Sequence, residues 1–174
     1  MKRQLVTIQK CELNDLDLLH QIAIQSYNDT YQYLWHDKGT WYLNQFYKKE
    51  TFEKELSNSG VFYFLIYDDN KAVGYFKMIE DVIEPYPASE CLELDKLYLL
   101  KEGIGKGIGK IVMDFVISFA KEKKRSILWL KVMECSPAKF LYEKSGFIQT
   151  DIYNLDYPEI VEEFAPITTM VLEL

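Results

Sequence analysis

Apolar residues recur along the chain in short runs and alternating stretches that predict a β-sheet. Residues 5–10 alternate apolar and polar side chains, which is typical of a half-buried strand. The apolar runs 61–67 and 72–79 flank the polar turn 68–71, so they predict a β-hairpin. Four further stretches have the length and character of strands: residues 91–100, 127–133, 146–153 and 167–174.

The stretches between these strands carry the spacing of helices. Asn14 or Asp15 is suited to cap a first helix, and residues 51–56 predict a short second one. Ser136-Pro137 opens another short helix, because proline fits the first helical turn, and Gly146 ends it. The expected core faces are Leu16, Leu19, Ile22, Ala23 and Ser26 in the first helix, and Ile108, Ile111, Val112, Phe115 and Phe119 in a long helix that follows residue 107.

Residues 26–49 give no such prediction, because aromatic side chains crowd this stretch without a clean period. Elsewhere the elements follow a β-α-β…β-α-β order, which indicates the α/β class with a mixed sheet and a strand–glycine loop–helix unit at its centre. The chain has 174 residues, 48% of them hydrophobic, and no repeat or linker divides it. We therefore expect residues 1–174 to form a single domain with one substantial core.

Composition argues against several classes of protein. The longest apolar run, residues 61–67, is far too short to cross a bilayer, so no membrane span is expected. The first ten residues carry charge without a hydrophobic stretch behind them, so we expect no secretory signal. Three widely spaced cysteines without a CxxC pair fit a reducing cytoplasm, and with only two histidines no metal site is expected.

Charge is distributed unevenly along the chain. The net charge is −7, yet residues 101–125 hold more basic than acidic residues. The basic cluster at 121–125 is expected to form a solvated helix face, whereas Lys106 and Lys110 lie within the glycine loop and favour an anionic ligand. The acidic remainder argues against nucleic-acid binding and suits a cationic partner.

The stretch LKEGIGKGIGK, residues 100–110, contains four of the eight glycines. Its spacing does not match a dinucleotide fingerprint, and Ile111 replaces the hydroxyl that a Walker A loop requires. What remains is a turn at 105–109 whose successive N–H groups form an anion nest at the positive end of a helix. The turn therefore predicts a diphosphate site without magnesium. The alternative is a glycine-rich turn that only packs.

Two segments resemble the signatures of the GNAT N-acetyltransferase superfamily. LYLLKEGIGKGIGKIVMDF is similar to a strand followed by Gln/Arg-x-x-Gly-x-Gly/Ala, and ECSPAKFLYEKSGF is similar to Asn-x-x-Ala-x-x-x-Tyr-x-x-x-Gly-Phe. SYNDTYQYL and TFEKELSN further resemble bacterial spermidine/spermine acetyltransferases of the Pai type. The resemblance covers most of the chain. It implies a GNAT fold, with a mixed, mostly antiparallel sheet flanked by helices, and a cytoplasmic N-acetyltransferase that uses acetyl-CoA as cosubstrate.

Aligned with these signatures, the chain departs from the family at two positions. Ile104 stands where the family has Gln or Arg, and Cys135 stands where it has Asn. Each departure removes a polar side-chain contact but leaves the backbone N–H donors. The cofactor-binding residues that the resemblance implies are Leu97, Tyr98, Leu99, Gly105, Lys106, Gly107, Ile108, Gly109, Lys110 and Cys135.

The same resemblance implies direct acetyl transfer to an amine through a tetrahedral intermediate. Tyr142 matches the family tyrosine that points at the CoA sulfur, so it is the expected general acid. Glu93 and Asp95 alternate to one face of the preceding strand, and either could take the proton of the amine. We favour Asp95, because it is nearer the reactive centre beside Leu97. A water chain is the alternative.

Aromatic and acidic residues in two segments predict a pocket for a cationic amine. The resemblance implies that the acceptor pocket is built by the segment after the first helix and by the last strand pair. The substrate-binding residues that we expect are Tyr27, Asp29, Tyr31 and Tyr153. Further candidates in the same segments are Tyr33, Trp35, Asp37, Asp156, Tyr157, Glu159, Glu162 and Glu163. A polyamine such as spermidine or spermine ranks ahead of other small amines, peptide N-termini and antibiotics.

A second hypothesis is a non-catalytic GNAT-fold module that binds acyl-CoA or another protein without turnover. Ile104 and Cys135 favour the module, whereas Tyr142 and Asp95 favour an enzyme. Many members of the family dimerise, so the resemblance is also compatible with a homodimer.

Overall fold

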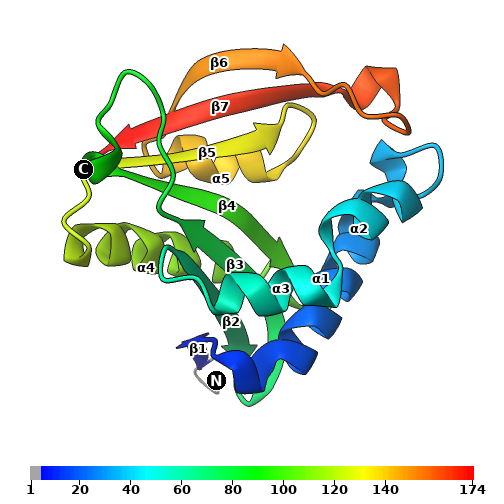
Figure 1. Ribbon diagram of the computed structural model, residues 1–174, viewed down its shortest axis with the longest axis horizontal. Coiled ribbons are helices and arrows are strands. Elements are labelled where there is room, and N and C mark those ends of the chain that lie inside the picture. The colour runs from blue at the N-terminus through cyan, green and yellow to red at the C-terminus, as the bar shows by residue number, and fades with distance from the viewer. Residues whose placement is uncertain (1–4) are drawn as a thin grey trace.

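The computed structural model describes residues 5–174 and contains a seven-stranded sheet of order β1-β2-β3-β4-β5-β7-β6 (Figure 1). Neighbouring strands are antiparallel except β4 and β5, which are parallel. The mixed, mostly antiparallel sheet is as predicted. The strands are β1 (Val6–Lys10), β2 (Val61–Asp68), β3 (Lys71–Ile79), β4 (Cys91–Leu99), β5 (Ile127–Met133), β6 (Ile148–Asn154) and β7 (Pro166–Glu173).

Helices cover the sheet in two layers, because β2 and β3 bury side chains on both faces. Tyr63 and Leu65 pack in one core cluster with α1, while Phe64 and Ile66 pack in another with α4. Successive residues of a strand point to opposite faces, so the continuous apolar run of β2 feeds both layers. The helices are α1 (Leu16–Tyr31), α2 (Thr40–Phe46), α3 (Lys49–Leu56), α4 (Ile108–Glu122) and α5 (Ala138–Lys144).

Two expectations need correction at the level of single elements. Ile111 does not belong to the core face of α4, because its side chain is 42% exposed. The buried face consists of Ile108, Val112, Met113, Val116 and Ala120, which follow the helical repeat along one side. Residues 26–49, for which no element was predicted, contain the end of α1, a short 3-10 turn and α2.

The pairing of β4 and β5 is short. Their register joins Cys91–Leu94 to Ile127–Leu130 and then ends, although β3 continues to pair with β4 as far as Leu99. Beyond Leu94, the edge of β4 that faces β5 therefore has no strand partner. The two strands separate from this point, as Figure 1 shows.

A β-bulge lies where the separation begins. Met78 pairs with Leu94 and Lys77 with Lys96, so Asp95 is the extra residue. The bulge changes the phase of β4, and as a result Leu94 and Leu97 contact the same core cluster although they are three residues apart. Without the extra residue, the alternation of the strand would turn one of them to the opposite face.

Among residues 5–174, no helix is both long and apolar enough to cross a membrane. The same residues contain no group of His, Cys, Asp and Glu side chains arranged to hold a metal ion. Cys11 and Cys91 are buried and Cys135 is exposed, and all three carry free thiols.

Candidate active site

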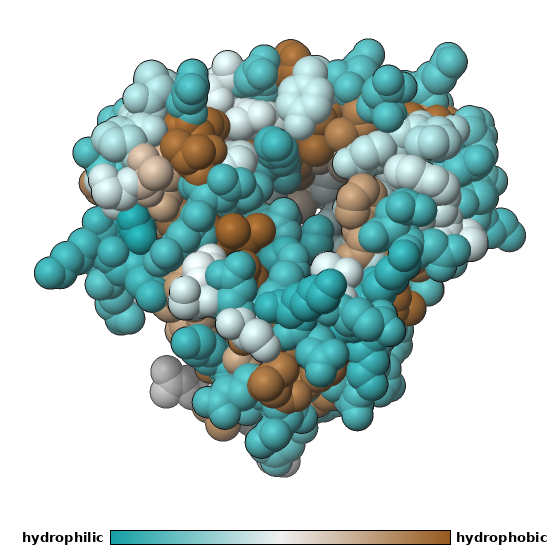
Figure 2. Space-filling model, viewed as in Figure 1, coloured by the Kyte–Doolittle hydropathy of each residue, from teal (hydrophilic) through white to brown (hydrophobic). Residues whose placement is uncertain are grey.

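A cleft of about 270 Å³ opens where β4 and β5 separate. Its walls are contributed by α1, α2, β4, β5, α5 and β6, so it lies between the two layers rather than on one of them. Figure 2 shows that the molecular surface is hollowed close to the centre of this view. Because the missing ladder leaves backbone groups unpaired along this part of β4, the cleft can hold a ligand that hydrogen-bonds to a strand edge.

Packed aromatic rings form one wall of the cleft. Tyr27 and Tyr42 stack with ring centroids 5.0 Å apart, and Trp35 stacks on Tyr42 at 5.0 Å. Tyr31 meets Tyr98 edge to face at 5.1 Å. The indole N–H of Trp35 donates to the hydroxyl of Tyr27 over 2.7 Å. Such a wall is rigid, and its π faces attract a cation that lies against them.

Glu93 provides a carboxyl group inside the cleft. It lies on β4 just before the bulge and is 7% exposed. Burial raises the pKa of Glu93 to about 7, and the neighbouring charge of Asp95 adds to the rise, while Lys131 opposes it. A carboxyl group with a pKa near neutrality can accept a proton at physiological pH and release it again.

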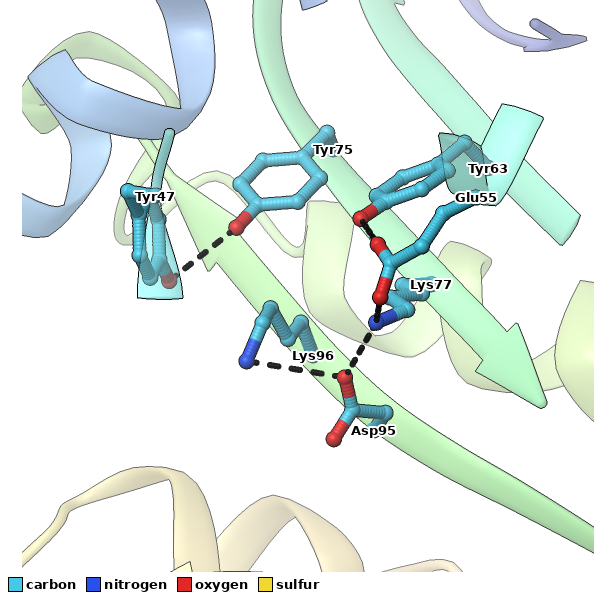
Figure 3. A network of polar contacts seen from close by, with 7 residues as sticks. All are labelled: Tyr47, Glu55, Tyr63, Tyr75, Lys77, Asp95 and Lys96. Atoms are coloured by element: carbon cyan, nitrogen blue, oxygen red, sulfur yellow. Dashed lines mark hydrogen bonds and ion pairs between the residues drawn. The ribbon is translucent and has the colours of Figure 1, made fainter. Parts of the chain in front are cut away.

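Asp95 also lines the cleft but is held in ion pairs. Its Oδ2 lies 3.1 Å from Nζ of Lys77 and 3.5 Å from Nζ of Lys96 (Figure 3). Burial alone would raise the pKa of Asp95, but Lys96 and Lys77 outweigh it and hold the pKa below its usual value. Asp95 is thus a fixed anion, and Glu93 is better suited to accept a proton.

Tyr142 lines the cleft from α5. It is 6% exposed, and within the described residues its hydroxyl has no hydrogen-bond partner. Burial raises the pKa of Tyr142 well above its usual value, so the phenol keeps its proton. The helix that carries it is ended by Gly146, whose φ of 98° suits glycine at this position.

The glycine loop presents backbone donors at the start of α4. Gly105 and Gly107 have φ values of 78° and 76°, and no heavy atom lies within 4 Å of where their Cβ atoms would be. Among residues 5–174, no backbone carbonyl accepts a hydrogen bond from the N–H groups of 105–110. These free donors, together with the helix dipole, make an open cradle for an anion.

The loop is connected to the cleft through α5. A Cβ on Gly109 would lie 2.9 Å from Leu141 Cδ2, so the first turn of α4 packs closely against the helix that carries Tyr142. Each of the two loop lysines pairs with an acidic residue. Lys106 Nζ lies 3.0 Å from Asp68 Oδ2, and Lys110 Nζ lies 2.8 Å from Asp114 Oδ2, one turn further along α4. The Lys110–Asp114 pair is exposed and therefore weak, so Lys110 can turn to an anionic ligand, whereas the side chain of Asp68 is largely covered and holds Lys106 more firmly.

The three predicted catalytic residues and part of the predicted binding residues converge on the cleft. Those that line it are Glu93, Asp95, Leu97, Tyr98, Tyr142, Tyr27, Tyr31 and Tyr153. Asp29 does not, because its carboxylate accepts a hydrogen bond from the backbone N–H of Lys101 over 3.3 Å. Cys135 is exposed, and its Sγ lies 3.6 Å from the hydroxyl of Tyr33.

Among the aromatic and charged residues of the cleft, sequence reasoning missed Tyr42, Lys96 and Lys131. Tyr42 lies on α2, in the segment that lacked a clean period. Lys96 directly follows Asp95, and this adjacent pair of opposite charges, which interrupts the alternation of the strand, was the signal for a bulge that turns both toward the cleft.

Comparisons with known proteins show what the chain as a whole is similar to. The profile described as "Acetyltransferase (GNAT) family" matches residues 21–147. Over 55 residues the chain is 46% identical to the [Ribosomal protein bS18]-alanine N-acetyltransferase of Haemophilus influenzae. That alignment covers 32% of this chain and 38% of the relative, so the chain matches well under two thirds of that protein.

Two solved structures resemble the whole fold. The PaiA N-acetyltransferase of Thermoplasma acidophilum, in complex with coenzyme A, superposes with a TM-score of 0.73 and 22% identity over 98% of this chain and 99% of that one. The spermidine N-acetyltransferase of Vibrio cholerae, in complex with CoA and spermine, gives a TM-score of 0.71 and 17% identity over 97% and 95%. At these identities the likeness concerns the fold.

The raised pKa of Glu93 predicts a pH-dependent stability. Since the folded state holds the proton more tightly than the unfolded state, the stabilisation is complete below the usual pKa of 4.5 and is lost as the pH rises through about 7. Glu93→Gln stays neutral, so its free energy of unfolding should increase relative to that of the wild type as the pH rises from 4.5 to 8. Urea unfolding at several pH values measures this gain. The exposed Glu53→Gln is the control, and a difference independent of pH would contradict the prediction.

Proposed function

The chain belongs to the GNAT acetyltransferase family, and from this premise we propose that it transfers the acetyl group of acetyl-CoA to the primary amine of a small cationic acceptor. One observation carries the proposal: a carboxyl group with a pKa near 7, Glu93, and a buried phenol that keeps its proton, Tyr142, line the same cleft. One group suits the removal of a proton from an ammonium, and the other suits the delivery of a proton to a leaving thiolate.

The residues around the cleft fit acetyl-CoA. In the proposal, the free N–H groups of 105–110 bind its diphosphate, and the unpaired edge of β4 at Leu97–Leu99 hydrogen-bonds to the pantetheine arm. The absence of any atom near the missing Cβ positions of Gly105 and Gly107 supports this fit, because a diphosphate needs close access to the backbone. Acetyl-CoA supplies an activated thioester whose thiol is the leaving group.

The chain's own groups then have separate roles. Glu93 accepts a proton from the amine, so that the nitrogen has a free lone pair. A backbone N–H on the unpaired edge of β4 stabilises the negative charge that develops on the acetyl oxygen, which can contribute on the order of 10²–10³ in rate. Tyr142 donates its proton to the sulfur. Asp95, which the sequence favoured as base, keeps the role of a paired anion.

The acceptor that we propose is a polyamine. One primary amine reaches Glu93 between the aromatic faces of Tyr31 and Trp35, where cation–π attraction holds it. The rest of the acceptor extends toward residues 155–164, which border the cleft through Leu155 and Tyr157. This border carries the carboxylates Asp156, Glu159, Glu162 and Glu163. The likeness to the spermine complex supports the same acceptor class.

A panel of amines tests the proposal. The purified protein is mixed with acetyl-CoA and, separately, with spermidine, spermine, a monoamine and a peptide that begins with alanine, and the release of free thiol is followed. We expect spermidine and spermine to be acetylated fastest. Preference for the peptide would replace the polyamine by a protein N-terminus, as the partial likeness to the ribosomal-protein enzyme allows. Saturable CoA binding without turnover on any amine would overturn the enzyme in favour of a binding module.

The glycine loop predicts how CoA affinity responds to charge. Gly107→Glu places a carboxylate among the backbone donors, so it should abolish CoA binding in calorimetry by repulsion. Gly107→Asn is the matched control, because asparagine tolerates a positive φ and brings no charge. It should fold and retain much more affinity. Equal affinity of the two variants would remove the diphosphate from this loop.

Tyr142 predicts a kinetic effect without a binding effect. Tyr142→Phe removes only the hydroxyl, so kcat should decrease at least about tenfold while CoA affinity stays close to that of the wild type. The control is Tyr86→Phe, whose hydroxyl lies 3.0 Å from Glu173, away from the cleft. An unchanged kcat for Tyr142→Phe would exclude the phenol as the proton donor.

A further inference from the structure

A buried lysine joins two carboxylates behind the cleft. Lys77 on β3 is 5% exposed, and its Nζ lies 2.8 Å from Glu55 Oε1 of α3 and 3.1 Å from Asp95 Oδ2 of β4. The other oxygen of Glu55 accepts a hydrogen bond from the hydroxyl of Tyr63. Figure 3 shows that these side chains form one continuous row, which Lys96 extends on the far side of Asp95.

The position of this row in the fold is informative. Lys77 pairs with Lys96 at the bulge, directly opposite the place where Asp95 is inserted. A buried lysine is costly to the fold unless its charge is paired, so Lys77 and the two carboxylates hold each other in place. The row therefore connects α3, through Lys77 of β3, to the strand that carries Glu93.

We propose that Lys77 is a positioning residue for acetyl transfer: by pinning Asp95 in the bulge, it keeps a negative charge of fixed place and strength beside Glu93, and so sets the pH range in which Glu93 works as the base. The inference rests on the proposed function for its consequence in catalysis. The electrostatic part concerns the protein alone and does not require turnover.

The charges around Glu93 determine the direction of each effect. Asp95 and Lys96 face it from β4, Lys131 from β5, and Asp81 from the segment after β3. Asp95 disfavours the ionised form of Glu93, whereas the lysines favour it. Removing the charge of Asp95 must therefore make Glu93 more acidic. Removing Lys77 leaves Asp95 less well neutralised, so Glu93 must become less acidic.

Two variants with opposite expected shifts test this inference. Asp95→Asn keeps the shape of the side chain, and it should move the titration of Glu93 to lower pH by about one unit. Lys77→Met keeps the length of the side chain without the charge, and it should move the titration to higher pH. The measurement is NMR titration of ¹³C-labelled glutamate carboxyl groups, in which the Glu93 signal is identified by its loss in Glu93→Gln.

The same variants are then compared in the pH dependence of kcat/KM with spermidine. The acidic limb should move in the same directions, and it should persist in Asp95→Asn, which it would not do if Asp95 were itself the base. Lys49→Met breaks an exposed ion pair with Asp17 and serves as the control that shifts neither profile. If Lys77→Met does not fold, Lys77→Gln, which is neutral but can still hydrogen-bond to Glu55 and Asp95, replaces it in the same titration.

Three outcomes are distinguishable. A titration of Glu93 that does not move in Asp95→Asn, or that does not move to higher pH in the Lys77 variant, overturns the inference, whatever the activity. Loss of the acidic limb in Asp95→Asn also overturns it and makes Asp95 the base. If the titrations shift as expected but the wild type acetylates no amine, the charge arrangement stands, while the proposed function and the catalytic role of Lys77 both fail.

Discussion

The early end of the parallel pairing between β4 and β5 is the constraint on which the rest of the structure depends. After Leu94 the two strands no longer share hydrogen bonds, yet β3 still holds β4 as far as Leu99 and β7 holds β5 as far as Met133. Each strand is therefore rigid on one edge and unpaired on the other. A backbone edge in a protein interior needs hydrogen-bond partners, and a ligand that lies along the strand can provide them.

The bulge at Asp95 brings charged side chains into the cleft. It keeps the leucines of β4 in the α4 core on both sides of the insertion, while Asp95 and Lys96 line the cleft. A charged side chain in this buried position is stable only when it is paired, and Lys77 provides the partner of Asp95. Within residues 5–174 Glu93 makes no ion pair, and burial therefore brings its pKa into the range where proton transfer is useful.

The aromatic residues serve packing and binding with the same rings. Tyr27 is buried and accepts a hydrogen bond from Trp35, so it is a core residue of the α1 layer as well as part of the cleft wall. A wall of this kind loses little side-chain entropy when a ligand binds, since the rings are already ordered. The packing of the fold therefore orders the wall of the cleft before any ligand binds.

The sequence by itself determined the elements whose pattern is local: the β2–β3 hairpin, the glycine turn before α4, and the short helix that carries Tyr142. These follow from residue spacing and from the conformations that glycine and proline allow. Tertiary structure decided what depends on partners far apart in the chain. It tied Asp29 to Lys101, and it brought Glu55, Lys77 and Asp95 together across three elements. The reason is physical: a period of two or 3.6 residues encodes a buried face, whereas the partner of a buried charge is set by which strands become neighbours and in what register.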